Sequence, residues 1–282
     1  MSATITTLDL ELTGRCPLAC LHCYAGSGPT GGHGVMTADD WLDVIAQGAD
    51  FGITHVQLIG GEPTAHPSFQ RILRTALDYG LSVEVFTNLV HVRAEWWSLF
   101  SCQGVTLGTS YYSDQADDHD QVTGRAGSHA RTRANIEQAL HRSIPIRASV
   151  IKTRDDQRVE QAREELLKLG VSFVRIDWAR GVGRGSALRG SAPDLTQLCG
   201  RCGKSKAAIT PDGDLFPCVM TRWMPAAGNV RTTPLGDIIG GETWRELVTV
   251  IPPRQVHGCP PDDGNDCGPA NNEVCGPAYD DD

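Results

Sequence analysis

The sequence has no surplus of positive charge, no long apolar run and no export signal. Its 25 lysine and arginine residues face 34 aspartate and glutamate residues, giving a net charge of -9 and a pI near 5.4. Binding to a phosphate backbone normally needs a concentrated basic surface, so this balance disfavours nucleic acid as a partner. No apolar stretch is long enough to cross a bilayer, and the start MSATITTLDL lacks the basic, then apolar, order of a secretion signal. We therefore expect a cytoplasmic protein with no membrane partner.

Cysteine, in contrast, is abundant. Ten cysteines without an export signal are poorly explained as disulfides, because the cytosol keeps thiols reduced, and metal ligation explains them better. Nine of them fall into two groups, one near the N-terminus and one after residue 198, and only Cys102 stands alone. We expect Cys102 to be a buried structural thiol.

The first two thirds of the chain alternate short apolar segments with helical patterns, which is typical of β/α units and a parallel sheet. Helices are predicted after an N-cap at Thr37, from residue 69 to Gly80, around Trp96, and over residues 128–141 and 157–169. Six such units predict an α/β fold, a partial (β/α)6 barrel whose chemistry lies at the carboxyl ends of its strands. The predicted strands cover residues 7–12, 55–59, 82–87, 105–109, 144–151 and 172–177.

After Trp178 the composition shifts to glycine, proline, cysteine and aspartate, and periodicity nearly vanishes. This part has too little apolar content to build a core of its own, so we expect a small annex held by metal. The predicted domains are the barrel, residues 1–180, and the cysteine-rich annex, residues 181–282. Within the annex, AAITPDGDLFPC is typical of a hairpin with a Pro-Asp-Gly turn.

Cys16, Cys20 and Cys23 directly follow the first predicted strand. Thiolates are the usual ligands of iron–sulfur clusters, and three of them on a four-iron cluster leave one iron open for a small chelating cofactor. A zinc site or a chance group of buried thiols is the alternative. The segment GGEP ends the second predicted strand, where glycines let the backbone approach a ligand and a carboxylate can neutralise an ammonium group.

Both motifs resemble those of the radical S-adenosylmethionine (SAM) superfamily. The sequence CPLACLHCY is similar to its CxxxCxφC loop, with His22 at the usually aromatic position. The resemblance implies a [4Fe-4S] cluster on the three cysteines, SAM chelated to the open iron, and a 5'-deoxyadenosyl radical that abstracts hydrogen from a substrate. It also implies that GGEP holds the amino group of SAM. The residues that it assigns to SAM binding are Tyr24, Gly60, Gly61, Glu62, Pro63, Asn88, Ser110 and Arg147.

Two of these expectations leave alternatives open. Arg147 alternates with Ile146 and Ala148 in a predicted strand, so its side chain leaves the face that they use and can point into the barrel mouth. A surface salt bridge explains it equally well. The segment RGVGRG, residues 180–185, resembles the stretch after the sixth strand in relatives with a cysteine-rich extension, and its glycines equally suit a plain linker.

The second cysteine group begins with CGRCGKSKAAITPDGDLFPC, which resembles the opening of the SPASM extension of radical SAM enzymes that often act on ribosomally made peptides. A full extension continues with five further cysteines, and this chain has only three. The resemblance implies one auxiliary [4Fe-4S] cluster and leaves a second open, and zinc is the alternative for this group. The candidate ligands are Cys199, Cys202, Cys218, Cys259, Cys267 and Cys275.

The preferred function is therefore that of a maturase that installs a cross-link or a related modification in a ribosomal precursor peptide. The alternatives are formylglycine formation in a sulfatase, chemistry on a small metabolite, and a non-catalytic zinc or iron–sulfur protein. Relatives often carry an N-terminal leader-binding segment, whereas the first strand is predicted to begin at residue 7 here. We therefore expect a separate leader-binding protein as a possible partner, besides an electron donor such as flavodoxin or ferredoxin. The sequence does not identify a catalytic acid, base or hydrogen donor.

Overall fold

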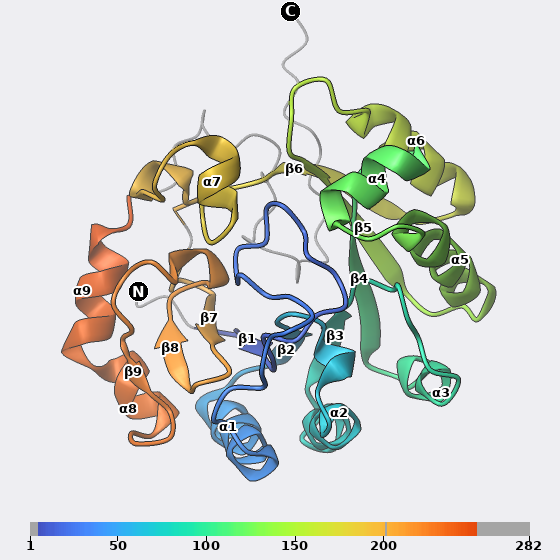
Figure 1. Cartoon of the computed structure of the whole chain (residues 1–282). Coiled ribbons are helices and arrows are strands. Elements are labelled where there is room, and N and C mark those ends of the chain that lie inside the picture. Colours follow the sequence, from blue (N-terminus) through green and yellow to red (C-terminus); the bar gives the residue numbers. More distant parts are fainter. Residues whose placement is uncertain (1–4, 201, 253–282) are drawn as a thin grey trace, which may run out of the picture.

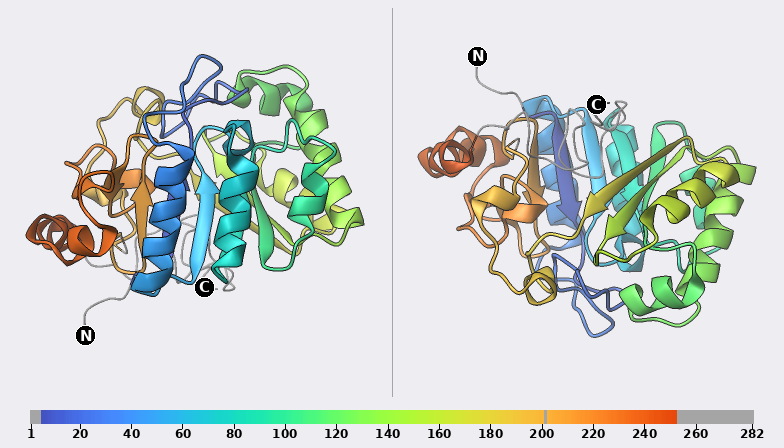
Figure 2. Two further views of the ribbon diagram at one scale, coloured as in Figure 1. Left: turned by 90° about the horizontal axis from the view of Figure 1, so that it is seen from below. Right: turned by 90° about the horizontal axis from the view of Figure 1, so that it is seen from above.

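The computed structural model describes residues 5–200 and 202–252, and in this part of the chain nine strands form one sheet. Their order is β6-β5-β4-β3-β2-β1-β7-β8-β9, and neighbouring strands from β6 to β7 run parallel. The sheet curves into an open barrel with helices on its outer face (Figures 1 and 2). The strands are β1 Thr7–Glu11, β2 His55–Ile59, β3 Ser82–Phe86, β4 Val105–Tyr111, β5 Ile146–Lys152, β6 Phe173–Trp178, β7 Lys206–Ile209, β8 Asp214–Phe216 and β9 Gly228–Asn229.

The six predicted β/α units and the partial barrel are confirmed, with strand boundaries shifted by two residues at most. Among the barrel helices, α4 escapes prediction because its sequence ADDHDQVT is polar and shows no helical repeat of apolar residues. The annex helices α7, α8 and α9 were not predicted either, and they span only five, six and nine residues. The helices are α1 Ala38–Phe51, α2 Phe69–Asp78, α3 Trp96–Phe100, α4 Ala116–Thr123, α5 Ser128–His141, α6 Val159–Leu169, α7 Gly185–Arg189, α8 Leu235–Gly240 and α9 Glu242–Val250.

Strand alternation separates an apolar outer face from a polar interior. In β1, Leu8 and Leu10 are fully buried and belong to the main core between the sheet and the outer helices. Asp9 and Glu11 alternate with them and therefore point into the barrel, where they are equally buried. The helices cover the apolar face by their own periodicity, as in α1, where Trp41, Val44, Ile45 and Gly48 are its buried residues.

The predicted N-cap at Thr37 is present at the start of α1. The Thr37 side chain accepts a hydrogen bond from the Asp40 backbone amide, and the Asp40 carboxylate accepts one from the Thr37 amide, which completes a capping box. At the other end, Gly52 adopts a left-handed conformation with φ of 98°. Cys102, expected to be buried, is instead exposed, because it lies in the turn between α3 and β4.

The annex continues the barrel sheet. Strand β7 pairs in parallel with β1, and β8 runs antiparallel to β7 through the predicted Pro-Asp-Gly turn. Helix α8 packs against α1, so the annex also shares the outer layer. The boundary at residue 180 stays a prediction, and Cys259, Cys267 and Cys275 lie outside the described residues. Across the described ranges, no helix has the length and apolar content needed to span a membrane.

Candidate cofactor and substrate site

The loop between β1 and α1 brings the first cysteine group together. Cys16, Cys20 and Cys23 all line one hollow at the barrel mouth, although their exposure ranges from buried to intermediate. The loop is fixed to itself by hydrogen bonds from the Cys16 amide to the Gly28 carbonyl and from the Cys23 amide to the Cys20 carbonyl. Three cysteines of one short segment therefore face the same hollow, as a shared cluster requires.

Arg184, in the connection between β6 and α7, braces this loop. Its Nε donates to the Cys20 carbonyl at 2.8 Å, its Nη2 donates to the Ser27 carbonyl at 2.7 Å, and its backbone amide donates to the Cys23 carbonyl at 3.0 Å. Gly183 adopts φ of 59°, and a Cβ there would lie 2.2 Å from the Tyr24 carbonyl oxygen. The RGVGRG segment is therefore in close contact with the cysteine loop and is more than a linker.

Gly60 and Gly61 allow the end of β2 to approach the same loop. Gly60 has φ of 128°, and its Cβ would lie 2.7 Å from the Thr13 carbonyl oxygen. A Cβ on Gly61 would lie 2.4 Å from the Arg15 carbonyl oxygen. Both glycines line the hollow that holds the three cysteines, so the structure brings the two sequence motifs together.

The Glu62 carboxylate ties β2 to β3. Its Oε1 accepts hydrogen bonds from the Thr64 and Thr87 hydroxyls at 2.7 and 2.8 Å, and its Oε2 accepts one from the Asn88 amide at 2.9 Å. Burial raises the pKa of Glu62, and these hydrogen bonds oppose that shift. An ionised carboxylate has about four acceptor positions, so Oε2 keeps one for a further donor.

The other residues predicted to bind SAM divide into two sets. Tyr24, Asn88 and Ser110 line the cysteine hollow, and the Asn88 side-chain amide lies 3.7 Å from the Cys16 sulfur. Pro63 begins a short 3-10 turn, Pro63–Ala65, and is buried. Arg147 lies away from this set, because its guanidinium makes two hydrogen bonds to Glu84 inside the barrel. Arg147 therefore forms a salt bridge with Glu84, but this pair is buried inside the barrel and does not lie at the surface. A contact between Arg147 and SAM stays a prediction.

The hollow fits an iron–sulfur cluster with a bound cofactor. Burial is the largest influence on the Cys16 and Cys20 thiols and raises the pKa of each to about 12, so thiolates there need a compensating metal. Among the described residues, the buried Ser27 hydroxyl and His22 Nδ1 find no hydrogen-bond partner, although both residues line the hollow. Such orphaned groups are expected where a polar ligand binds.

The geometry also bears on the zinc alternative. Within the described ranges, no three histidine, cysteine, aspartate or glutamate side chains are arranged to hold one metal ion. A zinc ion would draw its cysteine sulfurs to about 3.8 Å from one another, given Zn–S bonds of about 2.3 Å in a tetrahedron. In an iron–sulfur cluster, by contrast, each cysteine ligates a different iron, so the sulfurs need not approach one another as closely.

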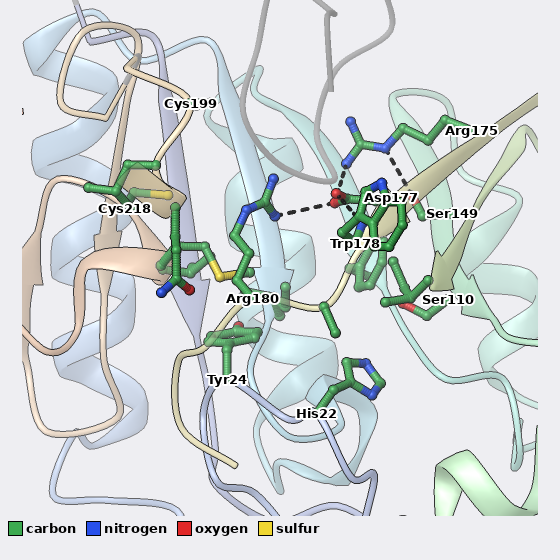
Figure 3. Close-up of a pocket in the computed structure, with 18 of the residues that line it drawn as sticks. His22, Tyr24, Ser110, Ser149, Arg175, Asp177, Trp178, Arg180, Cys199 and Cys218 are labelled. Carbon is green, nitrogen blue, oxygen red and sulfur yellow. Dashed lines mark hydrogen bonds and ion pairs between the residues drawn. The ribbon is translucent and has the colours of Figure 1, made fainter. Parts of the chain in front are cut away.

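A second hollow collects the described cysteines of the annex. Cys199, Cys202 and Cys218 line it together, because Cys202 precedes β7 and Cys218 follows β8 at the open end of the hairpin (Figure 3). The Cys202 thiol donates a hydrogen bond to Cys218, which raises the pKa of Cys202. Three of the six cysteines of this group therefore meet.

The opposite wall of this second hollow is charged. Asp177 lies 3.9 Å from the Arg175 guanidinium and 3.3 Å from that of Arg180, and the Arg175 Nε donates to the Ser149 hydroxyl (Figure 3). Trp178 and Phe86 supply apolar surface beside these charges. Such a wall offers both charged contacts and apolar packing to a ligand.

The two hollows adjoin, because they have five lining residues in common. His22, Tyr24, Ile59, Phe86 and Ser110 line both. A ligand in the second hollow would therefore lie between the first cysteine group and the annex.

Sequence reasoning missed several residues of this site. Arg175 and Asp177 stand two apart in an otherwise apolar strand, and that alternation marks them as facing the interior. Arg184 lies in the RGVGRG segment that the sequence singled out, but its contacts could not be predicted, because its partners lie more than 150 residues away along the chain.

Comparison with known proteins identifies both parts of the chain. The family model of the Radical SAM superfamily matches residues 10–166, which is more than half of the chain. The model of an iron–sulfur cluster-binding domain, SPASM, matches residues 199–268. The cofactors of these families are SAM and iron–sulfur clusters, as the sequence predicted.

Among curated proteins, the chain is 28% identical over 193 residues to a PqqA peptide cyclase of Rhodopseudomonas palustris, covering 67% of this chain and 51% of the relative. It is 27% identical over 190 residues to the antilisterial bacteriocin subtilosin biosynthesis protein AlbA of Bacillus subtilis, covering 66% and 42%. The chain thus spans about half the length of these relatives. Among solved structures, SuiB of Streptococcus suis bound to its precursor peptide SuiA superposes with a TM-score of 0.72 at 15% identity, covering 88% of this chain and 67% of that one.

Proposed function

The chain belongs to the radical SAM superfamily and carries an iron–sulfur cluster-binding domain, and from this premise we propose that it modifies a ribosomally made precursor peptide. The observation that carries the proposal is that the hollows lined by the two cysteine groups adjoin and share five residues. A substrate held there would meet the first group on one side and the annex on the other. The names of the similar proteins, a peptide cyclase and a bacteriocin biosynthesis protein, support a peptide as the substrate class.

We propose the following roles for the residues of the first hollow. Cys16, Cys20 and Cys23 hold the [4Fe-4S] cluster, and Arg184 fixes their loop through its backbone carbonyls. SAM bound to this cluster supplies the hydrogen-abstracting chemistry. Glu62 directly follows Gly61, which lines this hollow, and its second oxygen, which keeps one acceptor position, receives the ammonium group of SAM. Tyr24, Asn88 and Ser110 surround the remainder of the cofactor.

The second hollow positions the peptide. Ile59, Phe86, Trp178 and Leu198 exclude water from it, while the Arg175, Asp177 and Arg180 side chains offer hydrogen bonds to backbone amides or polar side chains. Cys199, Cys202 and Cys218 hold an auxiliary cluster on the substrate side. The other candidate ligands, Cys259, Cys267 and Cys275, lie outside the described residues.

The cellular setting belongs to the same proposal. Clusters held by thiolates need reduced cysteines, which favours the cytoplasm. A separate protein would bind the leader of the precursor, and a flavodoxin or ferredoxin would supply electrons. Formylglycine formation and chemistry on a small metabolite would use the same two hollows, and no contact in the described residues favours them over a peptide.

The test uses short peptides encoded beside the gene. Under anaerobic conditions, the reconstituted protein with SAM, a reductant and the cognate peptide should remove two hydrogen atoms from the peptide per cross-link, as mass spectrometry would show. Replacing Cys202 and Cys218 with Ala should abolish peptide modification and leave slow cleavage of SAM without peptide. Full modification by this variant would refute the substrate-side role of the annex.

A control separates this result from misfolding. Cys102 is an exposed cysteine outside both groups, and Cys102→Ala should leave modification and iron content unchanged. If no neighbouring peptide is modified while SAM is still cleaved, the peptide proposal fails and the small-metabolite class becomes the better one.

A further inference from the structure

Strand β6 is the last strand at one end of the described sheet, and the backbone groups on its outer edge face no other described strand (Figure 1). On its inner edge, the Ala179 amide donates to the Lys152 carbonyl of β5. The backbone groups of a parallel strand alternate between its two sides, so those of Asp177 and Arg175 also face β5. The residues whose amides and carbonyls point away from the sheet are therefore Val174, Ile176 and Trp178.

Side chains already bond to the outer two of these three residues. The Val174 carbonyl accepts a hydrogen bond from the Arg163 Nε of α6 at 3.4 Å, and the Trp178 amide donates to the Asp177 carboxylate at 2.7 Å. Ile176 lies between them, and in the described part of the chain its amide and its carbonyl have no hydrogen-bond partner. Unpaired backbone groups at a sheet edge are a template for a further strand.

The two ends of the sheet differ in how well they are protected against such pairing. At the other end, β9 has only two residues, one of them Gly228, and so short an edge strand discourages pairing. Strand β6 has six residues, FVRIDW, without proline, glycine or lysine, and its charged residues Arg175 and Asp177 line the second hollow. Beside its edge, Leu167 lies one helical turn after Arg163 on the same face of α6 and is 41% exposed. This edge therefore suits a strand with apolar side chains.

We propose that the precursor peptide binds as an additional strand along the edge of β6, through an extended segment with apolar residues at alternate positions. The inference rests on the proposed function, because it assumes a peptide substrate. Arg175, Asp177 and Trp178 of β6 line the second hollow, so a peptide paired with this strand continues into the site that holds the substrate (Figure 3). Side chains of an added strand alternate between the two faces of the sheet. Every second residue of the peptide therefore points into the barrel, and the residues between them contact the α6 face at Leu167.

The first test is hydrogen–deuterium exchange read at single residues. The probe is a peptide encoded beside the gene that the parent protein modifies. Peptide binding should slow exchange of the Ile176 amide about tenfold or more, and should leave the amides of Arg175 and Asp177, which already bond to β5, unchanged. Unchanged exchange at Ile176 would overturn the proposal, because strand pairing must engage that amide.

A pair of variants separates the backbone amide from the side chain. Ile176→Pro removes the outward amide but no hydrogen bond to β5, and proline is tolerated at such a position of an edge strand. Ile176→Ala shortens the side chain and keeps the amide. Peptide affinity should fall about tenfold in the first variant and less in the second, while SAM cleavage without peptide should match the parent in both. Equal losses of affinity would overturn the proposal.

The peptide itself gives a test that does not depend on how a variant folds. Methylation of one peptide amide at a time should weaken binding about tenfold at every second residue of the paired segment, because alternate amides face β6. Methylation of the amides between them should have little effect. A pattern without this period of two would overturn the proposal.

Other occupants of the edge give different results. If exchange at Ile176 is already slow without peptide, the edge is covered by a second copy of the chain when dilution speeds the exchange, and by the same chain when dilution has no effect. Either result overturns the proposal. Peptide modification without any effect at Ile176 overturns this proposal alone, whereas failure to modify any peptide overturns the proposed function as well, so the two failures are distinguishable.

Discussion

At the scale of single residues, Glu62 connects the ends of two neighbouring strands, β2 and β3. Its oxygens accept hydrogen bonds from Thr64, Thr87 and Asn88. Replacing Glu62 with Gln removes the charge that we propose for the SAM ammonium and keeps the size of the side chain. A hydrogen bond to a charged group contributes about 1.5–3 kcal/mol, so SAM affinity should fall about tenfold or more. Equilibrium binding to the reconstituted protein measures this.

Thr64→Val is the control for that prediction. It removes one hydrogen bond to the same carboxylate without changing its charge, so its effect on SAM affinity should be smaller than that of Glu62→Gln. Equal losses in the two variants would mean that Glu62 only ties the strands together. Unchanged affinity in Glu62→Gln would mean that the ammonium site has been placed wrongly.

Glu11 makes stability depend on pH. Its carboxylate points into the barrel 3.2 Å from the Arg222 guanidinium, yet burial outweighs this partner and raises the pKa of Glu11 from 4.5 to about 7. The folded protein therefore keeps a proton that the unfolded chain loses. The resulting stability is fully present below pH 4.5 and is lost as the pH rises through about 7.

Glu11→Gln should remove this dependence because the side chain is then neutral at every pH. Between pH 5 and pH 8, the variant should gain stability relative to the parent, by up to about 3 kcal/mol for the full pKa difference. Thermal unfolding midpoints at the two pH values measure the change, and Glu246→Gln on the exposed side of α9 is the control. If the two variants shift alike, Glu11 does not titrate in this range.

At the scale of elements, the RGVGRG segment after β6 holds the cysteine loop, because Gly183 leaves no room for a Cβ beside the Tyr24 carbonyl. Gly183→Ala should therefore displace the loop and lower the iron bound by the first cysteine group, which iron analysis and the electron spin resonance of the reduced cluster would show. Gly190→Ala is a matched control, since Gly190 has a similar φ of 66° and open space around it. Equal iron loading in both variants would contradict the bracing role.

The sequence predicted those elements whose determinants are local. The alternation of Leu8, Leu10 and Leu12 marks the first strand, and the N-cap residue Thr37 marks the start of α1. Contacts between distant segments could not be predicted, because nothing in the local pattern encodes a partner. The Arg184 bonds to the cysteine loop and the Arg147 pair with Glu84 belong to this class. The same holds for the pairing of β7 with β1, which joins the annex to the barrel.

At the scale of the whole molecule, the continuous sheet relates the two cysteine groups. The cysteine loop leaves β1, and the annex hairpin begins with β7, the neighbour of β1 in the sheet. Groups nearly 180 residues apart in sequence therefore line hollows that adjoin. The pairing of β7 with β1 therefore determines where a substrate would lie relative to the two cysteine groups, whichever bond the protein forms.

The most direct test of this account is the formation of 5'-deoxyadenosine from SAM by the anaerobically reconstituted and reduced protein. The parent should form it. The variant with Cys16, Cys20 and Cys23 replaced by Ala should form none and should still bind iron in the annex. Undiminished cleavage of SAM by that variant would contradict the account, because the cluster would then have to lie elsewhere.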